Sequence, residues 1–173
     1  MQLVIAPTFA MKINKSNSLG VSLLVTHQQF KADGLQGFGG YTPGSATATG
    51  STSLTNNGRD KSNGVGLRFG WMGKLSDQVT LGAAYATRTR MSKFDKYKEL
   101  FAEGGDLDIP ENWNIGAAFK PNDTWTFAAD YQRINYGDVK SIANPSTNGG
   151  ALIGPTAGAF NPAWANTGTL GCD

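Results

Sequence analysis

Residues 65–71 read Val65-Gly66-Leu67-Arg68-Phe69-Gly70-Trp71, with a large apolar side chain at every odd position and glycine or arginine at every even position. Successive side chains of a β-strand point to opposite faces, so a period of two places each set on its own side of a sheet. The stretch therefore predicts a strand with one apolar face and one face of small or polar residues.

The same alternation recurs on both sides of this stretch. Odd positions are again the more apolar ones along 19–25, 79–85, 113–119 and 125–131, and the opening residues around Leu3 fit the pattern too. Segments of about 9–12 residues are long enough to cross the apolar core of a membrane as tilted strands. Six such strands are expected, near residues 2–13, 19–30, 64–72, 79–90, 111–120 and 125–136.

Two features of these strands favour a membrane barrel over a soluble β-sandwich. The less apolar face is rich in Gly, Ala, Thr and Asn and carries few charges in mid-strand, unlike a face exposed to water. Aromatic residues lie near strand ends on the apolar face, as in the aromatic girdles of outer-membrane barrels. They are Trp71, Tyr85, Trp113, Phe119, Trp125 and Tyr131. A sandwich core, the alternative, would also contain aromatic rings.

The connections between the strands alternate in length. Short polar segments at 14–18, 73–78 and 121–124 suit hairpin turns. Long segments follow, at 31–63, at 89–108 and from Gly137 onward, and residues 39–63 are mostly Gly, Ser, Thr and Asn. Short periplasmic turns and long extracellular loops are typical of outer-membrane barrels. This sorting by length is the strongest sequence evidence for that fold.

Composition excludes several other classes of protein. The 173 residues are 39% hydrophobic and 16% charged, with a net charge of +2 and no basic stripe, so nucleic acid is not an expected partner. One cysteine (Cys172) and one histidine (His27) give no intrachain disulfide and no zinc ligand set. The sequence contains no run of 18 apolar residues, so no membrane-spanning helix is expected. We expect no metal and no cofactor.

Neither an enzyme active site nor a secretion signal is recognisable. His27 stands alone near a strand end and is interpreted as a rim residue rather than a general base. Met1 is followed directly by apolar residues, with no charged segment and no cleavage motif. We therefore expect a non-enzymatic protein, and we expect this sequence to be an internal part of a longer chain.

The second long connection contains a predicted helix over Lys93–Glu103. Ser92 and Asp95 have the spacing of a capping box, and two glycines follow Glu103. Four apolar side chains share one helical face and are candidate ligand-binding residues: Phe94, Tyr97, Leu100 and Phe101. Such a face above the barrel rim either packs on the rim or remains available to a hydrophobic ligand.

Three arginines are the other candidate ligand-binding residues. Counting every second residue places Arg68 on the inner face of its strand, and Arg88 and Arg90 on the inner face of theirs. A carboxylate that enters an apolar passage needs a cation to offset its desolvation, and arginine offers two parallel hydrogen bonds. The alternative is that these arginines bind lipopolysaccharide phosphates or loop carboxylates.

Several stretches resemble the FadL-type outer-membrane transporters of long-chain fatty acids. Asp108-Ile109-Pro110-Glu111-Asn112-Trp113 resembles a strand entry of that family, and residues 125–136 (WTFAADYQRINY) resemble the strand that follows it. Ile5-Ala6-Pro7-Thr8 and Leu19-Gly20-Val21-Ser22 resemble its middle strands. The resemblance extends over most of the chain, apart from the low-complexity loop.

The resemblance implies a larger barrel, of about fourteen strands, with a plugged lumen, of which this all-β antiparallel chain supplies about six strands. It also implies a monomer in the outer membrane that passively transports hydrophobic molecules, most often long-chain fatty acids, in contact with outer-membrane lipid and lipopolysaccharide. By this resemblance, ligand capture by the loop helix is preferred over rim packing. A small structural or adhesive protein that acts through its loops is the alternative, whether an outer-membrane barrel or a β-sandwich.

Overall fold

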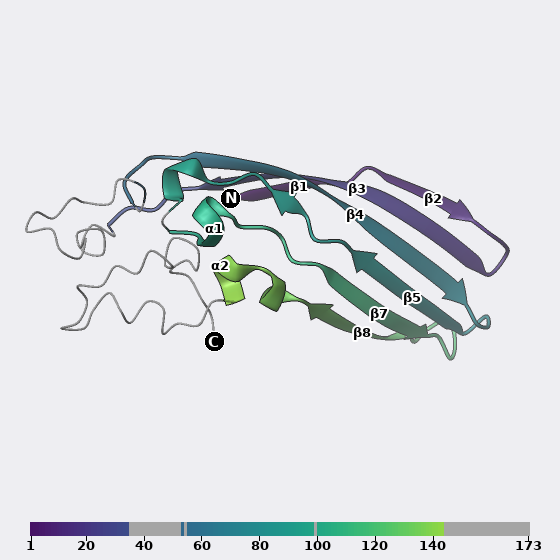
Figure 1. Cartoon of the computed structure of the whole chain (residues 1–173). Coiled ribbons are helices and arrows are strands. Elements are labelled where there is room, and N and C mark those ends of the chain that lie inside the picture. The colour runs from purple at the N-terminus through teal and green to yellow at the C-terminus, as the bar shows by residue number, and fades with distance from the viewer. Residues whose placement is uncertain (35–52, 54, 99, 144–173) are drawn as a thin grey trace, which may run out of the picture.

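The computed structural model describes residues 1–34, 53, 55–98 and 100–143 and shows one curved antiparallel sheet (Figure 1). Its strands follow the order β1-β3-β4-β5-β7-β8, while β2 pairs with β3 and β6 pairs with β4. The strands are β1 (Gln2–Ile5), β2 (Thr8–Lys12), β3 (Asn17–Phe30), β4 (Asp60–Lys74), β5 (Val79–Ala86), β6 (Arg90–Met91), β7 (Asn112–Phe119) and β8 (Phe127–Ile134). All six expected strands are therefore present.

The first expected strand is interrupted at Pro7. β1 and β2 both pair with β3, in one continuous register that runs from Gln2 opposite Gln28 to Lys12 opposite Ser18. Proline has no N–H to donate to a neighbouring strand, and the Pro7 carbonyl still accepts the Leu23 N–H at 3.1 Å. β1 and β2 thus form one edge of the sheet with a gap in its hydrogen bonding.

Everywhere except at β6, the register keeps odd residues opposite odd residues. Examples are Val21 opposite Phe69, Phe69 opposite Tyr85, and Tyr85 opposite Trp113. Side chains of directly opposed residues lie on the same face, and we call the odd face the outer face. It exposes most of the large apolar side chains, among them Ile5, Phe9, Leu19, Val21, Leu23, Val25, Val65, Leu67, Phe69, Ile115, Phe127 and Tyr131. A continuous exposed apolar face of this extent suits contact with lipid tails.

The even face, which we call the inner face, is lined by smaller and more polar residues. On β3 these include Ser22, Thr26 and Gln28, which are buried. Toward the short-turn end the inner face is mostly glycine and alanine. The predicted assignment of the two faces is confirmed for every strand except β6.

The three short turns share one design. In each, a side-chain oxygen near the start of the turn accepts the backbone N–H groups two and three residues further on. Asn14 does so at 2.9 and 2.8 Å, Ser76 at 3.2 and 3.1 Å, and Asn122 at 3.1 and 3.0 Å. Such side chains replace a backbone hydrogen bond and fix a tight reversal. All three turns lie at the same end of the sheet (Figure 1).

The longer connections lie at the opposite end, so the predicted sorting by length is confirmed for the described residues (Figure 1). Residues 60–63, expected in the first long connection, belong to β4. The last described residues form a 3-10 turn, η3 (Tyr136–Asp138), and a short helix, α2 (Lys140–Ala143). Most of the glycine- and serine-rich loop, and Cys172, lie outside the described residues. Among the described residues, no helix has the length and apolarity needed to span a membrane.

Candidate functional site

The connection between β5 and β7 folds over the long-loop end of the sheet, and we call its described part, residues 87–98 and 100–111, the rim segment. Its two ends are held together by a short antiparallel bridge. The Thr89 N–H donates to the Ile109 carbonyl at 3.0 Å, and the Ile109 N–H donates back at 3.1 Å. The two ends of the rim segment are therefore fixed to each other.

A β-bulge opposite Gly66 alters the alternation at the start of the rim segment. Ala86 lies opposite Arg68, the Thr87 N–H donates to Leu67, and Arg90 lies opposite Val65. Between the last two pairs, Arg88 and Thr89 both face the single residue Gly66. One extra residue in one strand reverses the face of every residue that follows it.

The prediction that Arg90 lies on the inner face is therefore wrong. Arg90 lies opposite Val65, which belongs to the exposed apolar outer face, and its side chain is exposed. Arg68, opposite Ser22 and Ala86, lies on the inner face as predicted. Counting alternate positions fails at Arg90 because it assumes an unbroken strand through residues 86–90.

The predicted helix over 93–103 is also wrong as a continuous element. The structure has a 3-10 turn, η2 (Asp95–Tyr97), and a single helical turn, α1 (Ala102–Gly105), with Phe101 extended between them. The expected capping box is not formed, because Phe94 occupies the N-cap position without a side-chain hydrogen bond. The Ser92 hydroxyl instead accepts the N–H of Asn63 at 2.9 Å.

The four apolar candidates of the rim segment are brought together, but they are buried rather than exposed. Phe94, Tyr97, Leu100 and Phe101 are between 0 and 5% exposed and form one cluster. Phe30, on the inner face of β3, inserts among them, with its ring centre 5.0 Å from Tyr97 and 4.8 Å from Phe101. Edge-on ring contacts at these distances are favourable. The residues pack on the rim, so the preference for an exposed capture surface is not supported.

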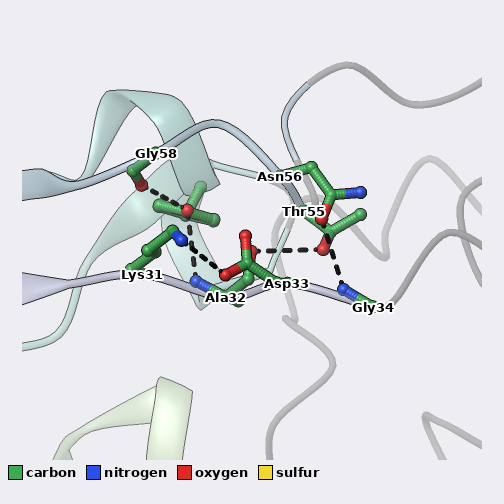
Figure 2. Close-up of polar contacts among 8 residues, drawn as sticks. Lys31, Ala32, Asp33, Gly34, Thr55, Asn56 and Gly58 are labelled. Atoms are coloured by element: carbon green, nitrogen blue, oxygen red, sulfur yellow. Dashed lines mark hydrogen bonds and ion pairs between the residues drawn. The ribbon is translucent and has the colours of Figure 1, made fainter.

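The Tyr97 hydroxyl joins the two ends of the first long connection. It donates to the Gly58 carbonyl at 2.6 Å and accepts the Ala32 N–H at 3.1 Å. Figure 2 shows further links between the same two chain segments: Thr55 donates to the Ala32 carbonyl and the Gly34 N–H donates to Asn56. The base of that loop is therefore closed by hydrogen bonds.

Arg88 is held by a buried carboxylate that the sequence did not single out. Its Nε donates to Asp108 Oδ2 at 2.7 Å, and Asp108 Oδ1 accepts the Met91 N–H at 2.6 Å. Asp108 is 6% exposed and Arg88 36%. The carboxylate thus ties the end of the rim segment to its beginning. The only sequence signal is an acidic residue at the start of Asp108-Ile109-Pro110, and that pattern indicates no more than a strand entry.

Further charges connect the rim segment to α2. Lys140 donates to Glu103 at 2.6 Å, and this contact holds the pKa of Glu103 below its usual range. The Ser141 hydroxyl accepts the Ala102 N–H at 2.9 Å and donates to the Asp106 carbonyl. Burial, followed by the negative charge of Asp108, raises the pKa of Asp106. Within the described residues there is no cluster of His, Cys, Asp and Glu that could hold a metal ion.

The comparisons with known proteins agree with this architecture. Residues 1–167 match the sequence profile of the family described as "Outer membrane protein transport protein (OMPP1/FadL/TodX)". The chain belongs to this family of outer-membrane β-barrel proteins. No curated protein gave a match.

Three solved structures share the fold. They are the toluene transporter TbuX of Ralstonia pickettii (14% identity, TM-score 0.53), the monoaromatic hydrocarbon channel CymD (19%, 0.51) and the toluene transporter TodX of Pseudomonas putida (21%, 0.51). The matches cover 79–80% of this chain and 42–45% of theirs. The chain thus spans less than half the length of these relatives, and its six strands correspond to part of a barrel wall.

Proposed function

We propose that the protein lets hydrophobic small molecules cross the outer membrane passively, through the interior of the barrel to which these strands belong. The single observation that supports this most is the register, which assigns an apolar outer face to six antiparallel strands in a chain that matches a family of transport proteins over residues 1–167. Closed barrels are the β-structures that satisfy every backbone group in a bilayer.

Neutral molecules are the favoured substrates. A long-chain fatty acid would carry a carboxylate into the lumen and would need a cation there. Of the three candidate arginines, Arg88 is paired with Asp108 and Arg90 lies on the outer face. Only Arg68 combines an inner position with the absence of an ion pair among the described residues.

The relatives give independent support for this preference. TbuX and TodX are described as toluene transporters and CymD as a monoaromatic hydrocarbon channel. We therefore place monoaromatic hydrocarbons ahead of long-chain fatty acids as the substrate class. Fatty-acid transport remains the alternative, and it would depend on Arg68.

Uptake by whole cells tests the proposal. Cells that lack their own FadL-type proteins would express the complete protein, and the initial uptake of labelled toluene, oleate and a small sugar would be measured. We expect faster toluene uptake, unchanged by Arg68→Gln, and no gain for the sugar. Toluene uptake equal to that of cells carrying the empty vector would contradict the transport proposal. Oleate uptake that is abolished by Arg68→Gln would favour the fatty-acid alternative.

A further inference from the structure

The bulge opposite Gly66 places a cation on the outside of the barrel wall. Arg90 lies opposite Val65 on the outer face, and its side chain is exposed. None of the described residues forms an ion pair with it. An unpaired arginine beside an apolar, lipid-facing surface is energetically unfavourable unless an anion or water hydrogen-bonds to it. Arg90 therefore needs a partner that approaches from the membrane side.

The position of Arg90 is the boundary between the apolar and polar parts of the outer face. Along β4 the outward residues change from Leu67 and Val65 to Asn63 and then Lys61. Along β3, Val25 lies opposite Val65 and His27 lies opposite Asn63, so the change occurs at the same level in both strands. The boundary faces the long-loop end of the sheet, which is the extracellular end of an outer-membrane barrel.

A groove of about 400 Å³ crosses this boundary, and we call it the outer-rim groove. Its apolar part is formed by Leu3, Ile5, Val25 and Val65, and its polar part by His27, Asn63 and Arg90. Lys61, one outward position further along β4, is exposed just beyond it. The groove thus combines an apolar floor with two cations at its upper end.

The polar side chains at the top of the groove are fixed by one another. His27 Nδ1 lies 2.7 Å from Asn63 Oδ1, and its Nε2 lies 3.0 Å from the Gln29 amide nitrogen. Because Asn63 Oδ1 faces the imidazole, the Asn63 NH₂ group remains as a donor beside Arg90. The upper end of the groove holds hydrogen-bond donors and no carboxylate among the residues that line it.

We propose that the outer-rim groove binds lipopolysaccharide, with a lipid A phosphate on Arg90 and Lys61 and an acyl chain over Ile5, Val25 and Val65. The charge is complementary, because a phosphate accepts two parallel hydrogen bonds from a guanidinium. The depth of Arg90 relative to the membrane is also appropriate, because the phosphates of the outer leaflet lie where the apolar band of the barrel ends. A transported substrate does not fit this role, since Arg90 lies on the outside of the wall. The proposal is independent of which molecule crosses the lumen.

Native mass spectrometry of the complete, detergent-solubilised protein tests this site with purified lipid A as the probe. Three proteins would be compared: the wild type, Arg90→Gln, and Arg68→Gln as the matched control with the same charge change on the inner face of β4. We expect lipid A to bind the wild type and the control equally, and Arg90→Gln about tenfold more weakly, as for the loss of one charge-assisted contact. Lys61→Gln in the Arg90→Gln background should weaken binding further.

Two further probes identify the group that is recognised. Lipid A without its phosphates should bind the wild type as weakly as intact lipid A binds Arg90→Gln, and phosphatidylglycerol should not compete. Equal binding of intact lipid A to the wild type and Arg90→Gln would overturn the proposal, as would phosphatidylglycerol binding as tight as that of lipid A. Heat-modified migration on gels confirms that each variant is a folded barrel. Toluene uptake should be unchanged in Arg90→Gln, so failure of this proposal and failure of the transport proposal are separable.

Discussion

Arg88 Nε donates to Asp108 Oδ2 at 2.7 Å and so joins the two ends of the rim segment, twenty positions apart in the chain. The carboxylate is almost fully buried, whereas the guanidinium is partly exposed, so solvent screens part of the interaction. Removal of the arginine leaves Asp108 with the Met91 N–H as its hydrogen-bond donor. The Arg88–Asp108 ion pair should therefore contribute to the stability of the rim segment.

Arg88→Gln should loosen the rim segment without affecting the strands. We expect a cost of about 1–2 kcal/mol, less than for a fully buried pair because of the exposure of Arg88. Amide hydrogen exchange in the complete protein should become about tenfold faster at Thr89 and Ile109 and remain unchanged in β3. Lys31→Gln, which removes the exposed Lys31–Asp33 ion pair, is the control. Unchanged exchange at Thr89 in Arg88→Gln would show that the ion pair does not hold the segment.

Tyr97→Phe should open the base of the first long connection. The substitution removes the hydroxyl that donates to the Gly58 carbonyl and accepts the Ala32 N–H. Both backbone groups lose this hydrogen-bond partner, which should reduce local stability by about 1–3 kcal/mol. Limited proteolysis should then cleave between residues 31 and 59 several-fold faster. Tyr136→Phe, which removes a hydroxyl from an exposed tyrosine, should leave the cleavage rate as it is. Equal rates for the two variants would contradict the role given to Tyr97.

Phe101→Ala should unfold the rim segment rather than merely remove a contact for a ligand. Phe101 is almost fully buried against Phe30 and Phe94, and truncation of such a side chain costs about 3–5 kcal/mol. Hydrogen exchange across residues 94–107 should rise together, while the barrel still shows heat-modified migration on gels. A variant with wild-type exchange and altered substrate uptake would instead restore the idea of direct ligand capture.

Asp106 should make the rim segment pH-dependent. Burial and the neighbouring Asp108 raise its pKa, so the folded segment binds this proton more tightly than the unfolded one. The stability that Asp106 contributes is therefore fully present at pH values below the ordinary pKa of an aspartate. It is lost as the pH rises through the raised pKa of the folded segment. Glu103, whose pKa is lowered by Lys140, acts in the opposite direction and loses its contribution as pH falls.

Asp106→Asn separates these two effects. It should slow hydrogen exchange of residues 102–108 at neutral pH and abolish the loosening that accompanies rising pH. Glu103→Gln should do neither, and should remove only the loosening on acidification. If exchange in Asp106→Asn still accelerates with pH beyond the intrinsic chemical rate, the pH dependence has another origin.

The strands could be predicted from sequence because a lipid-facing wall imposes a strict alternation. Every residue from Val65 to Trp71 obeys it, and the turn residues Asn14, Ser76 and Asn122 mark the hairpins. The bulge could not be predicted in this way. The sequence around Arg88 and Thr89 is compatible with an unbroken alternation, and only the register against β4 shows that one residue is extra. Alternation alone therefore assigns Arg90 to the wrong face.

The rim segment was only partly predictable. The spacing of Phe94, Tyr97 and Phe101 correctly indicated one apolar cluster, but a helix was not the only backbone that can assemble it. Phe30, from a distant part of the chain, supplies the surface on which the rings pack, and this contact favours an extended Phe101. Long-range partners of this kind, Asp108 for Arg88 included, leave no periodic signal in the sequence.

Gly66 should tolerate a side chain much less well than Gly70, which lies on the same face of β4. A Cβ placed at Gly66 would collide with the hydroxyl oxygen of Thr89 and would lie 3.3 Å from its Cβ, whereas a Cβ at Gly70 would meet nothing within 4 Å. Thr89 is buried and bridged to Ile109, so it cannot move away without breaking that bridge. Gly66→Ala should therefore displace the bulge, at a cost of about 1–3 kcal/mol from overpacking, while Gly70→Ala should cost much less. Hydrogen exchange at Thr89 and Ile109 would report the difference.

Displacement of the bulge should also weaken lipid A binding, because the bulge is what directs Arg90 outward. If Gly66→Ala and Gly70→Ala behave alike in both measurements, the close packing of Thr89 on Gly66 does not position Arg90.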